Sequence, residues 1–384
     1  MRITKLLLLA LAACFVTADS HPQTLQFRQS SISVGRGPRW ISVADVNRDG
    51  NPDILVANAD DGTVSVLLGN GKGQFRQAPG SPFAAGHLPN DIGVADMNGD
   101  GNLDLVIADH QSPYLTILLG DGKGSFKPAP GSPVDVHSNP HPHAVAVADF
   151  NQDGKLDVAT DSWASNQIEL LLGDGKGGLQ TPGRYFPVGR RPYERLRTAD
   201  FNRDGLPDIV TTNLDDGTVS ILLGDGKGGF RNAPGSPFPA GAKPWQVFVG
   251  DVNGDGNADL VIIPYERDLP SPALNVVTVL LGDGKGAFRP MGGPALSLVG
   301  CHGPNSVTAG DLGGTAGYVI AVDCAESRNL TLFERHPGLR FSVSSASSKG
   351  GWGSVAFARL TSDRHGELIT ADSDNGTITI FTPN

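Results

Sequence analysis

Asp200-Phe201-Asn202-Arg203-Asp204-Gly205-Leu206-Pro207-Asp208 is the stretch from which the organisation of this chain follows. It places oxygen-bearing side chains at loop positions 1, 3, 5 and 9 and a glycine at position 6. Such side chains can converge on Ca²⁺, which takes about six to eight oxygen ligands, and Gly205 permits the sharp turn. The β-branched run after position 9 indicates a strand and no helix. The stretch therefore predicts a calcium loop between two strands.

The same pattern occurs five times at a nearly fixed period. Its first positions are residues 45, 96, 149, 200 and 251, so successive copies lie 51, 53, 51 and 51 residues apart. A fixed period is typical of one supersecondary unit repeated along the chain. Polar turns without metal are the alternative. The residues expected to bind about five structural calcium ions are Asp45, Asn47, Asp49, Asp53, Asp96, Asn98, Asp100, Asp104, Asp149, Asn151, Asp153, Asp157, Asp200, Asn202, Asp204, Asp208, Asp251, Asn253, Asp255 and Asp259.

Each repeat is predicted to contain four strands. In the first repeat they cover residues 41–46, 53–57 and 63–68 and begin again at 74–76. These runs are apolar on both faces, which indicates sheets packed between neighbouring sheets. A glycine-rich segment such as residues 69–73 joins strands three and four. It carries a lysine, but no Lys-Ser/Thr pair or helix start follows, so we interpret it as a hairpin turn and not a phosphate loop.

The two ends of the chain complete one repeat between them. The sixth repeat starts at Asp311 and has lost the ligand residues. The seventh carries Arg359, Asp363 and Glu367 where the first has Asp45, Asp49 and Asp53, and we expect both loops to be empty. The seventh repeat stops after its third strand at residues 377–381, whereas residues 24–34 look like a fourth strand without a repeat. Joining them would close a ring without open sheet edges. Residues 24–384 are therefore predicted to form one all-β domain, a seven-bladed β-propeller.

These motifs resemble a known family. Asp-x-Asn-x-Asp-Gly-x-x-Asp loops followed by Leu-Leu-Gly-Asp-Gly-Lys-Gly-x-Phe hairpins are similar to the FG-GAP or VCBS-type repeats of integrin α-subunit heads and many secreted bacterial proteins. The resemblance covers about the whole chain after its first residues. It implies a propeller with calcium in the loops between strands one and two. Members serve adhesion, carbohydrate binding, carbohydrate cleavage and scaffolding, so the resemblance fixes no function.

The first residues predict export. Arg2 and Lys5 precede an apolar run and then small residues, which is typical of a signal peptide. Cleavage is expected after residue 18, or after residue 13 if Cys14 is lipidated as in a bacterial lipoprotein. We expect a monomer that is secreted, periplasmic or lipid-anchored at the bacterial cell surface, with Cys14 as its only membrane attachment. The net charge of −10 gives no indication of nucleic-acid binding.

A candidate binding face lies opposite the calcium loops. Strands one and two run in opposite directions, so the loops before strand one and after strand two share this face. Converging aromatic and hydrogen-bonding side chains at a propeller mouth predict a binding site, although Trp and Tyr side chains packed between blades are the alternative. We expect ligand contacts from Arg39, Trp40, Asn90, His141, His143, Tyr193, Arg195, Trp245 and Trp352. The same face carries Asp60, Asp91, His110, Asp161, Trp163, Glu194, Asp215, Gln246, Tyr265, Glu266, Arg267, His302, Asn305 and Asp374.

Three histidines on this face raise a second possibility. His137, His141 and His143 could bind zinc or copper, because imidazole suits these metals. Pro140 and Pro142 fix the backbone between them. We expect the His-Pro-His sequence to point successive rings apart, which disfavours a shared metal site.

Two further features concern chemistry and stability. Glu194 with Asp91 or Glu266 could act as an acid and base pair on a glycosidic bond; an ion pair of Glu194 with Arg190 or Arg195 is the alternative. Cys301 and Cys324 lie at the same end of neighbouring strands in the sixth repeat. We expect them to form a disulfide, with two buried thiols as the alternative.

The sequence thus predicts an exported, calcium-stabilised propeller. Its expected function is binding or adhesion, with a carbohydrate or an extracellular protein as the ligand at the mouth. The alternative is a polysaccharide lyase or hydrolase that uses the same face. A scaffold whose mouth is filled by its own side chains is a third possibility.

Overall fold

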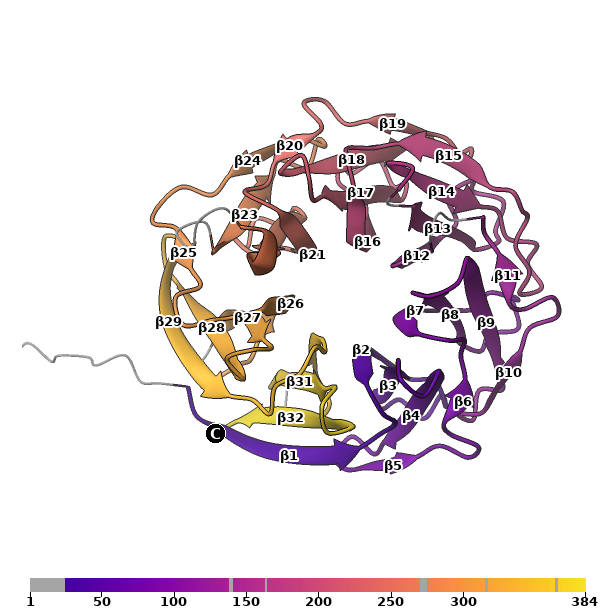
Figure 1. Ribbon diagram of the computed structural model, residues 1–384, viewed down its shortest axis with the longest axis horizontal. Coiled ribbons are helices and arrows are strands. Elements are labelled where there is room, and N and C mark those ends of the chain that lie inside the picture. The colour runs from indigo at the N-terminus through magenta and orange to yellow at the C-terminus, as the bar shows by residue number, and fades with distance from the viewer. Residues whose placement is uncertain (1–24, 138–140, 163, 270–274, 315–316, 363–364) are drawn as a thin grey trace, which may run out of the picture.

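The computed structural model describes residues 25–137, 141–162, 164–269, 275–314, 317–362 and 365–384. These residues form seven antiparallel sheets arranged in a ring around a central axis (Figure 1). The prediction of an all-β, seven-bladed propeller is confirmed. Helical structure in the described part of the chain is confined to the 3₁₀ turn η1 (Glu266–Asp268). No helix among the described residues has the length and apolar character needed to cross a bilayer.

The blades follow one another around the ring in chain order, and the first strand of each lies nearest the axis (Figure 1). The main strands of the first three blades are, in blade one, β2 (Pro38–Ala44), β3 (Asp53–Asn58), β4 (Thr63–Gly69) and β5 (Phe75–Gln77); in blade two, β7 (Pro89–Ala95), β8 (Asp104–Asp109), β9 (Tyr114–Gly120) and β10 (Phe126–Pro128); and in blade three, β12 (Val145–Ala148), β13 (Asp157–Ser162), β14 (Gln167–Leu171) and β15 (Arg184–Pro187). Blade four contains β16 (Pro192–Ala199), β17 (Asp208–Asn213), β18 (Thr218–Gly224) and β19 (Phe230–Asn232), and blade five contains β21 (Pro244–Gly250), β22 (Asp259–Pro264), β23 (Val276–Gly282) and β24 (Phe288–Pro290). Blade six contains β26 (Pro304–Asp311), β27 (Tyr318–Cys324), β28 (Asn329–His336) and β29 (Arg340–Ser347), and blade seven contains β30 (Val355–Ala358), β31 (Glu367–Asp372), β32 (Thr377–Pro383) and β1 (Phe27–Ser33). Short extra strands pair with the third strand of four blades: β6 (Phe83–Ala84), β11 (Val134–Asp135), β20 (Phe238–Pro239) and β25 (Leu296–Ser297).

The second strands are buried on both faces, as their apolar sequences predict. All six residues of β3 are buried, and so are all six of β8. Side chains of neighbouring blades share hydrophobic clusters; Leu55 of the first blade and Leu105 of the second belong to one of them. The core is therefore a series of layers between sheets, closed around the ring.

The first strand of the first blade differs from its predicted bounds. It starts at Pro38 and ends at Ala44, whereas we predicted residues 41–46. Asp45 and Val46 belong to the loop, because the Val46 N–H donates to the buried Asp53 carboxylate (2.9 Å) and not to a strand partner.

The ring closes through the pairing of its terminal segments. β1 pairs antiparallel with β32, in a register that runs from Phe27 opposite Pro383 to Ser33 opposite Thr377. Figure 1 shows β1 along the outer edge of the last blade, beside the C-terminus. The predicted completion of this blade by the N-terminal strand is confirmed, and it gives the seventh blade its fourth strand.

The sixth blade contains the predicted disulfide. Cys301 and Cys324 are bonded, with Cα atoms 5.2 Å apart, and both are fully buried. Cys301 precedes β26, and Cys324 ends β27. The bond therefore links the start of the first strand to the end of the second in a blade without calcium ligands.

We expect the double substitution C301A/C324A to lower the free energy of unfolding. A crosslink that closes a segment of this length contributes about 3 kcal/mol in the chain-entropy model. Chemical denaturation monitored by circular dichroism measures the change. Reduction of the wild-type protein should give a similar decrease and leave the variant unchanged, and an unaltered midpoint in both experiments would contradict a stabilising disulfide.

Candidate functional site

The five predicted calcium loops lie between the first and second strands of blades one to five. In the fourth loop, both oxygens of Asp200 accept backbone N–H groups, from Asp204 (3.1 Å) and Gly205 (2.9 Å). Asp204 in turn accepts the N–H of Leu206 (2.9 Å). Gly205 has a φ of +83°, which a glycine adopts without steric strain. The loop is thus folded by its own oxygen-bearing side chains.

Position 9 of each loop, the last Asp of the pattern, has a different role. Asp208 is fully buried, and its two oxygens accept the N–H groups of Phe201 (2.8 Å) and Gly224 (2.8 Å). It thereby ties the loop to the end of the third strand. The same pair of hydrogen bonds is made in the other four loops by Asp53, Asp104, Asp157 and Asp259.

The loops concentrate negative charge. The pKa of Asp208 is raised to about 6, first by burial and also by the nearby Asp204 and Asp200, although its two N–H partners lower it. The same holds, with pKa values of about 6, for Asp53, Asp104 and Asp259. Three carboxylates and an amide oxygen in one small loop form an all-oxygen donor set, and a divalent cation would relieve their repulsion. This donor set fits Ca²⁺.

The sixth and seventh loops depart from the pattern in two ways. In the seventh, Glu367 takes the place of the position-9 Asp: it lies opposite Ala358 and accepts the N–H of Leu360 (2.9 Å). Arg359 is exposed, and Asp363 lies outside the described residues. In the sixth, Tyr318 pairs with Asp311 where the other loops have a carboxylate. The seventh loop thus keeps the loop bond of position 9 without the carboxylate at position 1.

A pocket of about 280 Å³ lies at the opposite face, the mouth of the ring. Six of the nine predicted ligand-binding residues line it: Arg39, Asn90, Tyr193, Arg195, Trp245 and Trp352. Five further lining residues come from the same face: His110, Gln246, Tyr265, Arg267 and Asn305. These eleven residues define the mouth pocket. Trp40 lines a separate cavity of about 630 Å³ along the axis, with Gln246 shared between the two.

β-Bulges at the start of the first strands place these side chains. The pairing register shifts between Pro38 and Trp40, and equivalent shifts follow a proline in four other blades. A bulge re-aims a side chain out of the regular alternation. The residues inside the shifts that line the mouth pocket are Arg39, Asn90, Tyr193, Arg195, Trp245 and Asn305. A proline followed by a large polar or aromatic residue is the sequence signal for this arrangement.

The mouth pocket is positively charged. Its described lining contains three arginines and no carboxylate. The Arg195 guanidinium lies 4.0 Å from the centre of the Trp40 ring, and Arg267 lies 4.6 Å from that of Trp352. Stacking on an aromatic face orients a guanidinium, and its N–H groups point outward in the guanidinium plane. Arg267 also pairs with Glu326 (2.7 Å), so part of its charge is balanced. The pocket lining therefore contains oriented guanidinium groups.

Aromatic rings form a row beside these arginines. Tyr193 packs against Trp245 with ring centroids 4.9 Å apart, and Trp245 stacks on Tyr265 at 4.5 Å. Trp245 is largely buried in a cluster shared with the sixth blade, so the alternative of packing between blades describes part of its role. Its ring nevertheless lines the pocket.

The acid and base pair that we considered consists of Glu194 with Asp91 or Glu266, and the structure describes the side chains of the two possible partners. Asp91 is buried and accepts the N–H of Val145 (3.1 Å), with Arg197 as its ion-pair partner (3.3 Å). Glu266 contacts His302 and the Gly303 N–H. Neither carboxylate lines the mouth pocket. The Glu194 side chain and Trp163 lie outside what the structure describes, and Arg190 pairs with Asp216 (2.6 Å).

The histidine cluster differs from the one we considered in one member. His110, His141 and His143 have ring centroids 4.4 to 4.7 Å apart, whereas His137 is exposed and pairs with Asp135 (3.2 Å). The expectation of diverging rings was wrong for His141 and His143, because residues two apart in an extended segment point to the same side. Burial and the neighbouring imidazoles lower the pKa values of His110 and His141 to about 4.

Three of the calcium-type loops begin segments that match a known family of repeats. The profile of the FG-GAP-like repeat family matches residues 45–107, 96–160 and 200–262. Each match begins at the first Asp of a calcium-type loop. The chain carries FG-GAP-like repeats. No curated protein matches the sequence.

Solved structures share the propeller fold of these FG-GAP-like repeats at low sequence identity. BBS1N in complex with ARL6DN is 12% identical with a TM-score of 0.61, covering 94% of this chain and 97% of that chain. An Agrocybe aegerita lectin that recognises non-reducing terminal N-acetylglucosamine is 17% identical with a TM-score of 0.51, covering 91% and 87%. The periplasmic gluconolactonase PpgL of Pseudomonas aeruginosa is 18% identical with a TM-score of 0.55, covering 81% and 85%. These similarities establish the fold.

We expect Asp208→Ala to destabilise the FG-GAP-like propeller even in calcium-free buffer. The substitution leaves the buried N–H groups of Phe201 and Gly224 without acceptors, at a cost of about 1–3 kcal/mol each. Urea unfolding with chelator present at pH 7 measures the change. Asp204→Ala, at an exposed position of the same loop, is the control and should cost about 1 kcal/mol or less. Equal effects of the two substitutions would contradict the fastening role of position 9.

Proposed function

We propose that this protein is an exported binding module whose mouth pocket binds an acidic carbohydrate. The observation that carries the proposal is the pocket lining of three arginines, four aromatic rings and three amide side chains, without a carboxylate among the described residues. Guanidinium groups bind carboxylates and sulfates in paired hydrogen bonds. Aromatic faces give apolar contact to a sugar ring, and amides hydrogen-bond its hydroxyl groups. The three side-chain types together suit a charged sugar.

The size of the pocket limits how much of a ligand it can enclose. Its volume of about 280 Å³ is near the lower end of ligand pockets, which span roughly 300–1,000 Å³. The pocket therefore suits one sugar unit or the end of a chain. The lectin with the same fold supports carbohydrate recognition as a use of such a propeller, because its described ligand is a terminal sugar.

Calcium has a structural role in this proposal. The five loops with three carboxylates each lie on the rim away from the mouth pocket, so their ions would stabilise blades without contacting the ligand. The N-terminal segment supports export, since Arg2, Lys5 and the apolar run after them are typical of a signal peptide. Calcium is plentiful outside the cytoplasm, which is consistent with both parts of the proposal.

An extracellular protein is the other ligand that the same chemistry could accept, through an acidic or aromatic side chain. The lyase or hydrolase alternative has less support. Glycoside hydrolysis generally uses two carboxyl groups beside the bond, and the described pocket lining has none. His143, a candidate base, is fully buried. The volume of the pocket also disfavours a mouth filled by its own side chains.

We expect the wild-type protein to bind uronic-acid or sulfated oligosaccharides on a glycan array and to bind neutral ones weakly. Arg39→Ala should lower the affinity about 10- to 100-fold, because a hydrogen bond to a charged group contributes about 1.5–3 kcal/mol. Arg289→Ala, on the exposed outer strand β24, is the control. Affinity should also fall with salt. Equal binding of neutral and acidic glycans, or equal loss in both variants, would refute an acidic ligand at the mouth.

Removal of calcium should lower the melting temperature. A ligand that binds only the folded state stabilises it by mass action, by about 2.7 kcal/mol per site at 100 times its dissociation constant. Thermal melts with chelator and with added CaCl₂ measure the shift, with MgCl₂ as the control for ionic strength. If melting is unchanged by excess chelator, the structural calcium sites are not supported.

A further inference from the structure

Three histidines from two neighbouring blades meet beside the mouth pocket. His110 follows the second strand of the second blade, whereas His141 and His143 precede the first strand of the third blade. Their potential ligand nitrogens all lie within 4.8 Å of one another. The cluster therefore draws its members from separate parts of the chain and does not result from local sequence alone.

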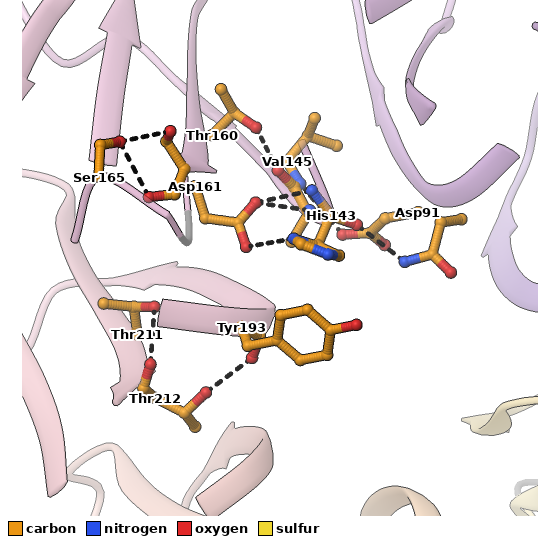
Figure 2. A network of polar contacts seen from close by, with 12 residues as sticks. Asp91, His143, Val145, Thr160, Asp161, Ser165, Tyr193, Thr211 and Thr212 are labelled. Carbon is orange, nitrogen blue, oxygen red and sulfur yellow. Dashed lines mark hydrogen bonds and ion pairs between the residues drawn. The ribbon is translucent and has the colours of Figure 1, made fainter. Parts of the chain in front are cut away.

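A buried carboxylate orients one of the three rings. His143 is fully buried, and its Nδ1 lies 3.3 Å from Oδ2 of Asp161 (Figure 2). The other oxygen of Asp161 accepts the backbone N–H groups of His143 (2.8 Å) and Ala144 (3.1 Å). Asp161 is thus fixed against the ring, and Nε2 of His143 is directed away from it. A carboxylate behind a histidine is the usual outer-shell arrangement at protein metal sites.

Two nitrogens of the cluster have no hydrogen-bond partner among the described residues. They are Nε2 of His143 and Nε2 of His141, and both are buried. A buried polar atom without a partner costs about 1–3 kcal/mol. Two such atoms turned toward a third imidazole indicate that something else satisfies them.

We propose that His110, His141 and His143 bind a divalent transition-metal ion of the zinc class. Imidazole nitrogens suit zinc and copper and are poor ligands for calcium. With Zn–N bonds of about 2.0–2.1 Å, tetrahedral ligand nitrogens lie roughly 3.3 Å apart, so the rings close inward when the ion binds. His110 and His141 are half-buried and can adjust, whereas Asp161 holds His143.

Three protein ligands leave a fourth coordination position, as in zinc sites that bind water or a ligand. His110 lines the mouth pocket, and the His143 ring packs on Tyr193, another lining residue (4.2 Å between centroids). The ion would therefore lie at the wall of the pocket, where its open position could take an oxygen atom of water or of a bound molecule. This site differs in ligand type and location from the oxygen-lined loops on the other rim.

Metal titration tests the proposal independently of any carbohydrate. Untagged protein, first treated with chelator and then saturated with Ca²⁺, is titrated with Zn²⁺ by calorimetry at pH 7.5. We expect about one Zn²⁺ per chain, and Co²⁺ should give the visible absorption bands of a tetrahedral site. H110A and H141A should each lose this site, and D161N should weaken it about 10- to 100-fold. H87A, which removes an exposed histidine outside the cluster, is the matched control.

The outcomes distinguish a specific three-histidine metal site from adventitious metal binding. H110A and H141A are chosen because their positions are half-buried, whereas His143 is fully buried. Thermal melting like that of the wild type, with and without calcium, shows that these variants are folded. The proposal is overturned if Ca²⁺-saturated wild-type protein takes up no Zn²⁺. It is equally overturned if H110A and H141A bind Zn²⁺ as the wild type does, or if H87A loses as much affinity as they do.

Discussion

The structure depends on one repeated interaction: a buried carboxylate that accepts two backbone N–H groups from different segments. Asp208 and its equivalents join the loop after the first strand to the end of the third strand. This bond sets where the first strand stops and keeps three strands of a blade in register. Glu367 keeps part of this arrangement in the seventh blade: one of its oxygens accepts the loop N–H of Leu360, and the other accepts the hydroxyl of Thr361. Blade geometry therefore rests first on hydrogen bonding, and a cation would add to it.

The buried carboxylates lie at one rim, and the mouth pocket lies at the other. Five of the first strands begin with a proline and a bulge, so a residue that would pack between sheets is turned toward the axis. These five blades bring such positions to one face, and the chain uses them differently: arginine, asparagine and aromatic residues occupy equivalent places. The scaffold is repetitive, whereas the mouth is not. That division explains how one repeat motif supports ligand sites of different chemistry.

The period of the loops was enough to predict the fold, the closing strand and the disulfide, because each follows from counting repeats and matching incomplete ends. The gathering of these polar and aromatic side chains at one face was also predictable, since antiparallel strands send alternate loops to opposite rims. Individual side-chain contacts were not predictable from the sequence. Arg197 lies over the Trp40 ring and pairs with Asp91. The only sequence signal for these contacts is that Arg197 follows Arg195 by two residues, which places both on the same face of the strand. His110 joins the histidine cluster from another blade, a contact that depends on how blades pack and leaves no mark in the local sequence.

The pairing of β1 with β32 also governs the order in which the molecule can form. Ser31 and Thr379 contact each other across 348 residues of sequence. During synthesis, β1 is made long before β32, its pairing partner. Until β32 is available the seventh blade lacks its outer strand. Completion of the propeller is therefore a late event that depends on segments from both ends of the described chain.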